Sequence, residues 1–174
     1  MIKHFFSFDD TRRRLLPLTA TALLAACASA PPPTPAPPTP VVTVKTAALL
    51  SIGFEKTDEG YVLNLPGPLL FETGGDVLSE GAKTVLAKLA TDLRALDMNS
   101  LRLFGHTDNV GTAEFNRGLS GKRAEAVAVA MIGQGFVTDK LQRRGFGVDR
   151  LLASNDTPEG RAKNRRDAVI VPFE

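Results

Sequence analysis

The spacing of apolar residues along the chain predicts two long helices. Apolar residues recur every three or four positions from residue 79 to residue 96, as on the buried face of a helix, and Ser79 is a suitable N-cap. A second stripe predicts a helix from about Ala113 to Gln134, which Gly135 ends. The predicted buried positions are Val85, Leu86, Leu89, Leu93 and Leu96 in the first helix, and Ala124, Val127, Ala128, Met131 and Ile132 in the second.

Shorter apolar runs between polar or glycine-containing segments predict strands. The residues concerned are 49–54, 61–65, 69–71, 101–105, 141–147 and 168–173. The first two runs flank the polar loop 56–60 and predict a hairpin-like pair. Strands that alternate with two helices indicate an α+β fold, in which a mixed sheet carries the two main helices on one face after a hairpin-like lead-in.

The start of the chain has the pattern of an export signal. Lys3 and three consecutive arginines, Arg12 to Arg14, precede an apolar run from Leu15 to Ala26. A basic start, a short apolar stretch and a small-residue end are typical of a secretory signal. A membrane-spanning helix needs roughly 20 apolar residues, and this run is shorter. Residues 11–16 also resemble a twin-arginine export signal, so the export route stays open.

Cys27, the chain's single cysteine, stands where the apolar run stops. The tetrapeptide LAAC at residues 24–27 resembles the lipobox of bacterial lipoproteins, which implies cleavage after residue 26 and lipidation of Cys27. Two or three acyl chains give stable anchoring. Ala28 after the cysteine implies, by the same resemblance, residence in the outer membrane with the domain in the periplasm. The alternative is an incidental cysteine in a signal that is cut after Ala28-Ser29-Ala30.

A proline tract, APPPTPAPPTP at residues 30–40, separates this signal from the rest of the chain. Proline fixes φ and lacks an amide donor, so the tract is expected to be extended polyproline II, roughly 30 Å long at about 3.1 Å per residue. A disordered tract without a defined reach is the alternative. The expected division is a signal at 1–26, lipidated Cys27 with a linker at 27–44, and one domain at 45–174, with a hairpin-like lead-in at 45–68 and a core at 69–174.

The composition of the chain excludes several classes of function. The 174 residues suffice for one ordinary domain, and the formal net charge of +2 gives no reason to expect a nucleic-acid partner. One cysteine excludes an internal disulfide and a thiolate zinc cluster. His106 lacks the further ligands that a metal site needs, and the Glu55/Glu59 pair lies in a polar run typical of solvated charge. We therefore expect no enzyme, cofactor or metal.

A set of polar residues follows the strand at residue 101. Asp108 lies in the loop after this strand, and Asn116, Leu119 and Arg123 share one edge of the second helix because their spacing brings them within roughly 60° of one another. This places a carboxylate and a guanidinium close together. They would form either an ordinary Asp108–Arg123 salt bridge or a receptor for a zwitterion, in which Arg123 binds a carboxylate bidentately.

Three blocks of sequence resemble the outer-membrane-protein-A-like (OmpA-like) domains. They are LLFETGGDVLSEGAKTVLAKLA at 69–90, GHTDNVGTAEFNRGLSGKRAEAV at 105–127 and GFGVDRLLASNDTPEGRAKNRR at 145–166. The resemblance implies a non-catalytic domain that binds the peptide stem of peptidoglycan at the zwitterionic end of diaminopimelate. It implies ligand contacts by Asp108, Arg123, Thr107, Asn116, Leu119 and Arg165, and by Thr73 and Gly74 in the loop after Phe71.

Two functions follow from this resemblance. One is a lipoprotein that tethers the outer membrane to the cell wall, with peptidoglycan and the lipid on Cys27 as its partners. The alternative is a wall-anchoring component of a larger envelope machine, of the stator or secretion-accessory type, with further protein partners. The chain departs from the family pattern at Leu151, at Asp167, where a small apolar residue is usual, and at Thr73-Gly74.

Overall fold

The computed structural model describes residues 40–72 and 74–173, and for residues 40–43 only the backbone. Cys27, most of the proline tract and Thr73 lie outside the described residues. The elements are α1 (Pro40–Ile52), β1 (Glu55–Thr57), β2 (Gly60–Pro66), α2 (Gly67–Leu70), α3 (Glu80–Ala95), β3 (Leu101–His106), α4 (Ala113–Gly133), the 3₁₀ turn η1 (Thr138–Lys140), β4 (Leu141–Gly147), α5 (Pro158–Asn164) and β5 (Arg166–Val171). No helix among the described residues is long and apolar enough to cross a bilayer.

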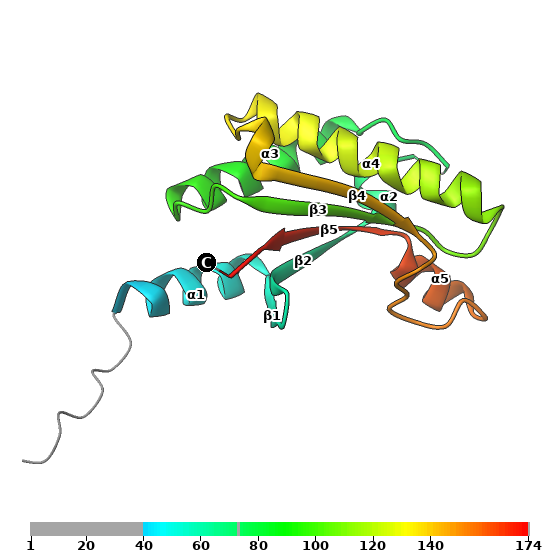
Figure 1. Ribbon diagram of the computed structural model, residues 1–174, viewed down its shortest axis with the longest axis horizontal. Coiled ribbons are helices and arrows are strands. Elements are labelled where there is room, and N and C mark those ends of the chain that lie inside the picture. Colours follow the sequence, from blue (N-terminus) through cyan, green and yellow to red (C-terminus); the bar gives the residue numbers. More distant parts are fainter. Residues whose placement is uncertain (1–39, 73, 174) are drawn as a thin grey trace, which may run out of the picture. The chain divides into compact units, whose positions relative to one another are not determined.

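The five strands form one mixed sheet in the order β1-β2-β5-β3-β4. β3 and β4 are parallel, and the other neighbouring pairs are antiparallel. β5 therefore lies between β2 and β3, although it is the last strand in the chain (Figure 1). In this register Asp167 on β5 faces Leu65 on one side and Gly105 on the other.

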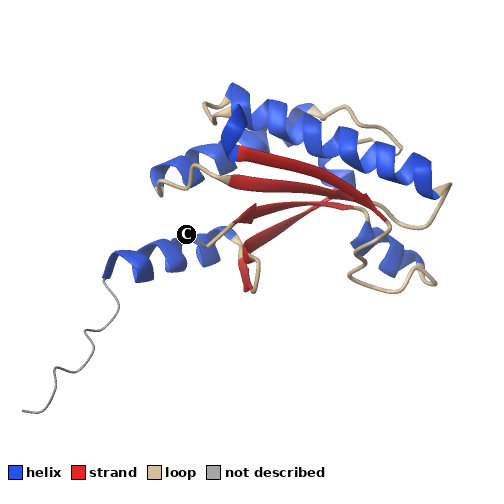
Figure 2. Ribbon diagram, in the orientation of Figure 1, coloured by secondary structure: helices blue, strands red, loops and turns tan. Residues whose placement is uncertain are grey.

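Helices α3 and α4 cover one face of the sheet (Figure 2). Each begins at the cap that its sequence provides: Ser79 accepts a hydrogen bond from the Ala82 amide, and Thr112 accepts one from the Phe115 amide. The core between these helices and the sheet is mainly aliphatic, with Phe54, Phe71 and Phe136 as its aromatic members. Its fully buried members include Leu86, Leu93, Leu101, Leu103, Val127, Met131 and Val169. This confirms the expected α+β architecture with two main helices on one face.

The other face of the sheet has a smaller cluster formed by Phe104, Phe146, Ala168 and Ile170. Two guanidinium groups lie over the Phe146 ring, that of Arg144 at 4.6 Å and that of Arg150 at 4.2 Å from its centroid. Cations over an aromatic face are attracted by the ring quadrupole and also shield the ring from water.

Two predicted strands were wrong. Residues 49–52 belong to α1, and Gly53, at φ +105°, ends that helix in a conformation that L side chains rarely adopt. The strand that pairs with β2 is instead Glu55–Thr57, so the hairpin exists with a shorter first strand. Residues 67–70 form the short helix α2, and Phe71 makes only an isolated bridge to Leu78. The first helix begins at Pro40, before the expected domain boundary at 45.

Candidate functional site

A cavity of about 450 Å³ opens where the end of β3, the start of α4 and the junction between α5 and β5 meet the loop after α2. It is lined by Gly67, Pro68, Phe71, Glu72, Gly74, Thr107, Asp108, Val110, Phe115, Asn116, Leu119, Arg123 and Arg165. Seven of the eight predicted ligand-binding residues are in this set, and the eighth, Thr73, lies outside the described residues. The structure thus brings together residues that lie far apart in the sequence, from Gly67 to Arg165.

Asp108 is fixed in the wall of this cavity by two donors. Its Oδ1 accepts a hydrogen bond from the Val110 amide at 3.1 Å, and its Oδ2 accepts one from Arg165 Nη1 at 2.7 Å. The first contact is the local turn that aspartate favours in loops. The Asp108 side chain is only 10% exposed. Of the two alternatives, the ordinary Asp108–Arg123 salt bridge does not form among the described residues, because Arg165 is the partner of Asp108.

Arg123 enters the cavity from α4 and is 5% exposed. Its Nε donates to the carbonyl oxygen of Gly75 at 2.8 Å, and its guanidinium lies 5.0 Å from the Phe71 ring centroid. These contacts hold the plane of the guanidinium while leaving its two terminal nitrogens without a hydrogen-bond partner among the described residues. Burial lowers the pKa of Arg123 from its usual value, and Asp167 is the charge that opposes this most strongly.

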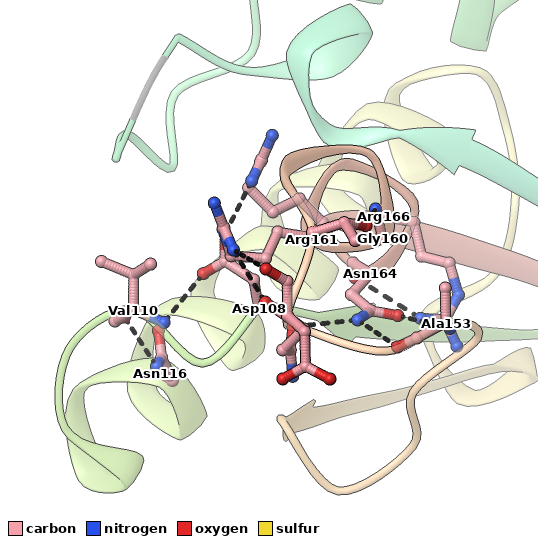
Figure 3. A network of polar contacts seen from close by, with 12 residues as sticks. Asp108, Val110, Asn116, Ala153, Gly160, Arg161, Asn164 and Arg166 are labelled. Carbon is pink, nitrogen blue, oxygen red and sulfur yellow. Dashed lines mark hydrogen bonds and ion pairs between the residues drawn. The ribbon is translucent and has the colours of Figure 1, made fainter.

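Asn116 braces the loop that carries Asp108. Its Nδ2 donates to the Val110 carbonyl at 2.9 Å, while the Asp108 carboxylate accepts from the amide of the same residue (Figure 3). Asn116 is 3% exposed. We expected Asn116 and Arg123 beside the buried stripe of the helix, but both are buried. Helix α4 starts beneath the loop that carries Asp108, and this loop covers helix residues that would otherwise be exposed to water.

Thr107 and Leu119 complete the inner wall. The Thr107 amide donates to the Gly147 carbonyl at 2.9 Å, whereas its hydroxyl is buried without a hydrogen-bond partner in the described part of the chain. Leu119 is half-buried. The exposed rings and methyl groups of Phe115 and Val110 form an apolar rim that our sequence analysis missed. The only signal for these two residues was their place on either side of the predicted helix start.

A second network of hydrogen bonds positions Arg165. Asn164 is fully buried, and its Oδ1 accepts from the amides of Leu152 and Ala153 at 2.8 Å and 3.1 Å. Its Nδ2 donates to the Ala153 carbonyl and to Asn155 Oδ1 (Figure 3). These bonds tie the loop before α5 to the end of that helix. Arg165 follows as the C-cap residue, and its carbonyl accepts from the Gly67 amide.

Close packing sets the height of α4 above the sheet. A Cβ atom at Gly105 or Gly145 would collide with the backbone of Ser120 or Gly121. Ser120 Oγ also accepts from the Gly147 amide at 2.9 Å. Only glycine at these sheet positions lets the helix approach so closely. This close approach places Arg123, which lies one turn further along α4, in the wall of the cavity.

His106 lies on the other face of the sheet, outside the cavity. Its ring stacks on Phe146 with a centroid distance of 5.4 Å. Burial, with further contributions from Arg166 and Arg150, lowers the pKa of His106 to about 3. Among residues 40–72 and 74–173, no group of three His, Cys, Asp or Glu side chains is arranged to hold a metal ion.

Of the charged groups that line the cavity, the Asp108 carboxylate is paired with Arg165, and the Arg123 guanidinium has no carboxylate partner among the described residues. Asp108 uses one lone pair on each oxygen, and a carboxylate has about four such sites, so further donors can bind. Arg123 offers its fork of terminal N–H groups. Val110, Phe115 and Leu119 supply an apolar rim. Such a site suits a small group that carries both charges next to an apolar stem.

Comparison with known proteins agrees with this description. The model of the OmpA family matches residues 70–165. The outer-membrane lipoprotein YfiB of Pseudomonas aeruginosa is 40% identical over 128 residues, which cover 74% of this chain and 76% of YfiB. The peptidoglycan-binding protein ArfA of Mycobacterium tuberculosis is 37% identical over 105 residues, 60% of this chain and 32% of ArfA. The periplasmic domain of Helicobacter pylori MotB superposes with a TM-score of 0.63 at 25% identity, covering 70% of this chain and 81% of that domain.

Proposed function

Because this chain belongs to the OmpA family, we propose that its domain binds peptidoglycan without catalysis, through the zwitterionic end of the diaminopimelate residue in the stem peptide. The relative ArfA is named a peptidoglycan-binding protein. The family match at residues 70–165 contains every residue that lines the cavity except Gly67 and Pro68. The family match thus covers the part of the chain in which the cavity is built.

The observation that carries this proposal is the separation of Asp108 from Arg123. If the two residues formed a salt bridge, the terminal N–H groups of Arg123 would be bound to the Asp108 carboxylate and would not be free for a ligand. Instead Asp108 is paired with Arg165, and Arg123 is held by a backbone carbonyl and an aromatic ring. A carbon atom bearing an ammonium and a carboxylate would place the first group against Asp108 and the second against the terminal nitrogens of Arg123.

Geometry favours arginine for the second contact. A guanidinium binds a carboxylate through two parallel N–H···O bonds, and the Gly75 and Phe71 contacts fix the plane of Arg123 before the ligand arrives. A pre-oriented group loses less side-chain entropy on binding than a free one. Thr107 supplies a buried hydroxyl that has no hydrogen-bond partner among residues 40–72 and 74–173, and Asn116 keeps the Asp108 loop in place.

Anchoring at the outer membrane is the second part of the proposal. Cys27 would be the first residue of the mature protein and would carry the acyl chains, with residues 28–39 as the spacer before α1. The relative in Pseudomonas aeruginosa is named an outer-membrane lipoprotein. With one end in lipid and the other on the wall, the protein would tether the outer membrane to peptidoglycan from the periplasm.

A second function uses the same site. The similarity to the MotB periplasmic domain supports a wall-anchoring role within a larger envelope assembly. Crosslinking in the intact envelope distinguishes the two functions, since a simple tether crosslinks to peptidoglycan and to no particular protein. An assembly component would yield one reproducible protein adduct.

Ligand chemistry tests the proposed binding. The soluble chain 28–174 is titrated with a stem peptide that contains diaminopimelate and with one that contains lysine, which keeps the ammonium but lacks the second carboxylate. If Arg123 binds that carboxylate, the lysine peptide should bind at least about 30-fold more weakly, as expected for loss of a partner from a buried charged pair. Equal affinity for the two peptides would contradict the zwitterion site.

A further inference from the structure

Asp167 is a carboxylate buried in the sheet beneath the helices. It is 2% exposed, and neither of its oxygens is bonded within the described part of the chain. Buried polar groups are nearly always hydrogen-bonded, and an unpaired buried charge is costly. Asp167 does not line the ligand cavity, so the binding site described above does not account for it.

The register of the sheet shows which side of β5 carries Asp167. Successive strand residues point to opposite faces. Val169 and Val171 belong to the core under the helices, so Asp167 points to that face as well. The preceding residue, Arg166, points to the other face, where it donates to Asn64 Oδ1 at 3.1 Å and to the Arg150 carbonyl at 3.0 Å. Arg166 is thus already bound on the far side of the sheet.

Arg123 is the cation on the same side as Asp167. Gly105, the cross-strand neighbour of Asp167, is in contact with the Ser120 backbone of α4, and Arg123 follows one turn later. Of all charged groups, Arg123 acts most strongly on the Asp167 carboxylate, and Asp167 is the acid that acts most strongly on Arg123. Other charges near Arg123 are Asp76, Asp108 and Arg165. No ion pair joins Arg123 to a carboxylate among the described residues.

From this cluster we propose that Asp167 is the resident counter-charge of Arg123 and determines how strongly the cavity holds the carboxylate of its ligand. When ionised, Asp167 attracts the guanidinium from the sheet side and competes with the ligand. When protonated, it leaves the full charge of Arg123 to the ligand. This inference rests on the proposed function, since it assigns Arg123 to a ligand carboxylate.

The protonation of Asp167 changes near neutral pH. Burial raises the pKa of Asp167 to about 7, against the opposing effect of Arg123 and then of Arg166. A ligand carboxylate beside Arg123 adds negative charge and favours the protonated form further. Binding is therefore accompanied by uptake of up to one proton from the buffer, and affinity falls as pH rises through about 7. His106, with a pKa of about 3, does not titrate in this range.

Calorimetry in two buffers of different ionisation enthalpy measures this proton uptake. The soluble chain 28–174 is titrated at pH 7 with the diaminopimelate stem peptide. We expect fractional proton uptake in the parent and its loss in Asp167→Asn, which keeps the shape but cannot ionise. We also expect Asp167→Asn to bind severalfold more tightly than the parent at pH 8. Asp139→Asn, an exposed acid at the opposite end of the sheet, should behave like the parent. Identical proton uptake in the parent and Asp167→Asn would overturn the proposal.

A titration without ligand keeps this test separate from the proposed function. The carboxyl ¹³C resonance of Asp167 is followed by NMR from pH 4 to pH 9 in the free protein. We expect a midpoint near 7, and a higher midpoint in Arg123→Gln, which lacks the opposing cation. A midpoint below 5, or an unchanged one in Arg123→Gln, refutes the role of Asp167. Failure of the parent to bind the stem peptide at any pH refutes the proposed function instead.

Discussion

Asp108 Oδ2 and Arg165 Nη1 are 2.7 Å apart, although 57 residues separate them in the chain. This pair connects the loop after β3 to the junction between α5 and β5 across one side of the cavity. It has a consequence for binding: Asp108 is held in place by an arginine that is not the proposed carboxylate receptor. The anionic and cationic halves of the site are therefore positioned by separate parts of the fold.

Loss of the Asp108–Arg165 pair should destabilise the fold more than loss of an exposed pair. In Arg165→Ala the Asp108 side chain, 10% exposed, retains one donor, and we expect the free energy of unfolding to fall by about 1–3 kcal/mol. Arg117→Ala is the control, because the side chains of the Arg117–Asp149 pair are 63% and 50% exposed, and it should cost about 0–1 kcal/mol. Urea denaturation measures both, and equal losses would contradict the assigned role of Arg165.

Asn164 should be among the least tolerant polar residues of the domain. Its side chain makes four hydrogen bonds to the loop before α5 and is fully buried. Asn164→Ala leaves two partly buried amides without their acceptor and should lower the free energy of unfolding by roughly 1–3 kcal/mol. Asn164→Asp keeps the acceptor but loses the donor, so an intermediate loss in urea denaturation is expected. Wild-type stability in Asn164→Ala would show that water replaces this network.

His106 should make the protein sensitive to acid. Its pKa is lowered from 6.5 to about 3, so below pH 6.5 the unfolded chain binds a proton that the folded chain excludes. Stability from this group is complete above pH 6.5 and is lost as pH falls toward 3, by up to about 1.4 kcal/mol per pH unit. In the Asp167→Asn background, where the opposing carboxyl group is absent, His106→Leu should flatten this slope. The comparison concerns slopes of unfolding free energy against pH, because the substitution also changes packing.

Asp167 should have the opposite effect on the free energy of unfolding, over a pH range that overlaps that of His106. Its pKa is raised from 3.8 to about 7, so between these values the folded chain keeps a proton that the unfolded chain has lost. Stability from the protonated group is therefore complete below pH 3.8 and is lost as pH rises through 7. Between about pH 4 and 6.5 the contributions of His106 and Asp167 offset each other. Asp167→Asn should reveal the His106 slope, and an equally flat profile in that variant would contradict this account.

Local sequence was sufficient to predict the elements that have clear end signals. Ser79 and Gly135 marked the start of α3 and the end of α4, and the apolar spacing between these signals gave most of both buried stripes. The prediction was wrong for Val85, which is exposed, and Leu96 and Ile132 are only half-buried. It was insufficient for α1: the start of this helix was assigned to the linker, and the short apolar run at 49–54 was predicted as a strand because such a run does not by itself distinguish a strand from a buried helix segment. The helix is chosen because Leu49 and Phe54 become buried against the rest of the domain, which is a tertiary effect. The seven-residue α5 was not predicted at all.

The candidate site was predicted as a set of residues but not as a set of pairs. The GHTD turn and the helix positions that follow it gave the cavity wall, because local spacing determines which residues share an edge. Pairing depends on contacts between distant segments. No local pattern shows that Arg165 would reach Asp108, that Gly75 would accept from Arg123, or that Asp167 would be buried on the helix side of β5.

Lipidation of Cys27 is a separate prediction from the leader sequence. Cys27→Ser should leave a precursor that is uncleaved or not anchored, because the thioether to the diacylglycerol can no longer form. Mass spectrometry of the membrane fraction identifies the mature N-terminus. An unmodified Cys27 in mature protein would contradict the lipoprotein assignment without affecting the binding site.

Spacer length should matter more than spacer sequence. Deleting residues 31–39 should reduce wall association in cells while leaving the affinity of the soluble domain unchanged. A Gly/Ser tract of equal length has a shorter mean reach, because flexible chains extend only as the square root of residue number, and should give an intermediate result. Equal wall association for all three chains, measured by crosslinking, would show that the tract is not a spacer.

Sedimentation with insoluble peptidoglycan tests the central claim most directly. The soluble chain 28–174 is compared with Asp108→Ala, Arg123→Ala and Arg123→Lys, and circular dichroism confirms that each is folded. Removing one charged partner should weaken binding by about 2–5 kcal/mol, roughly 30-fold or more, and Arg123→Lys should bind clearly less well than the parent because it keeps the charge but loses the planar fork. The account predicts folded variants that remain in the supernatant. Folded Asp108→Ala and Arg123→Ala variants that sediment with the wall as the parent does would contradict it.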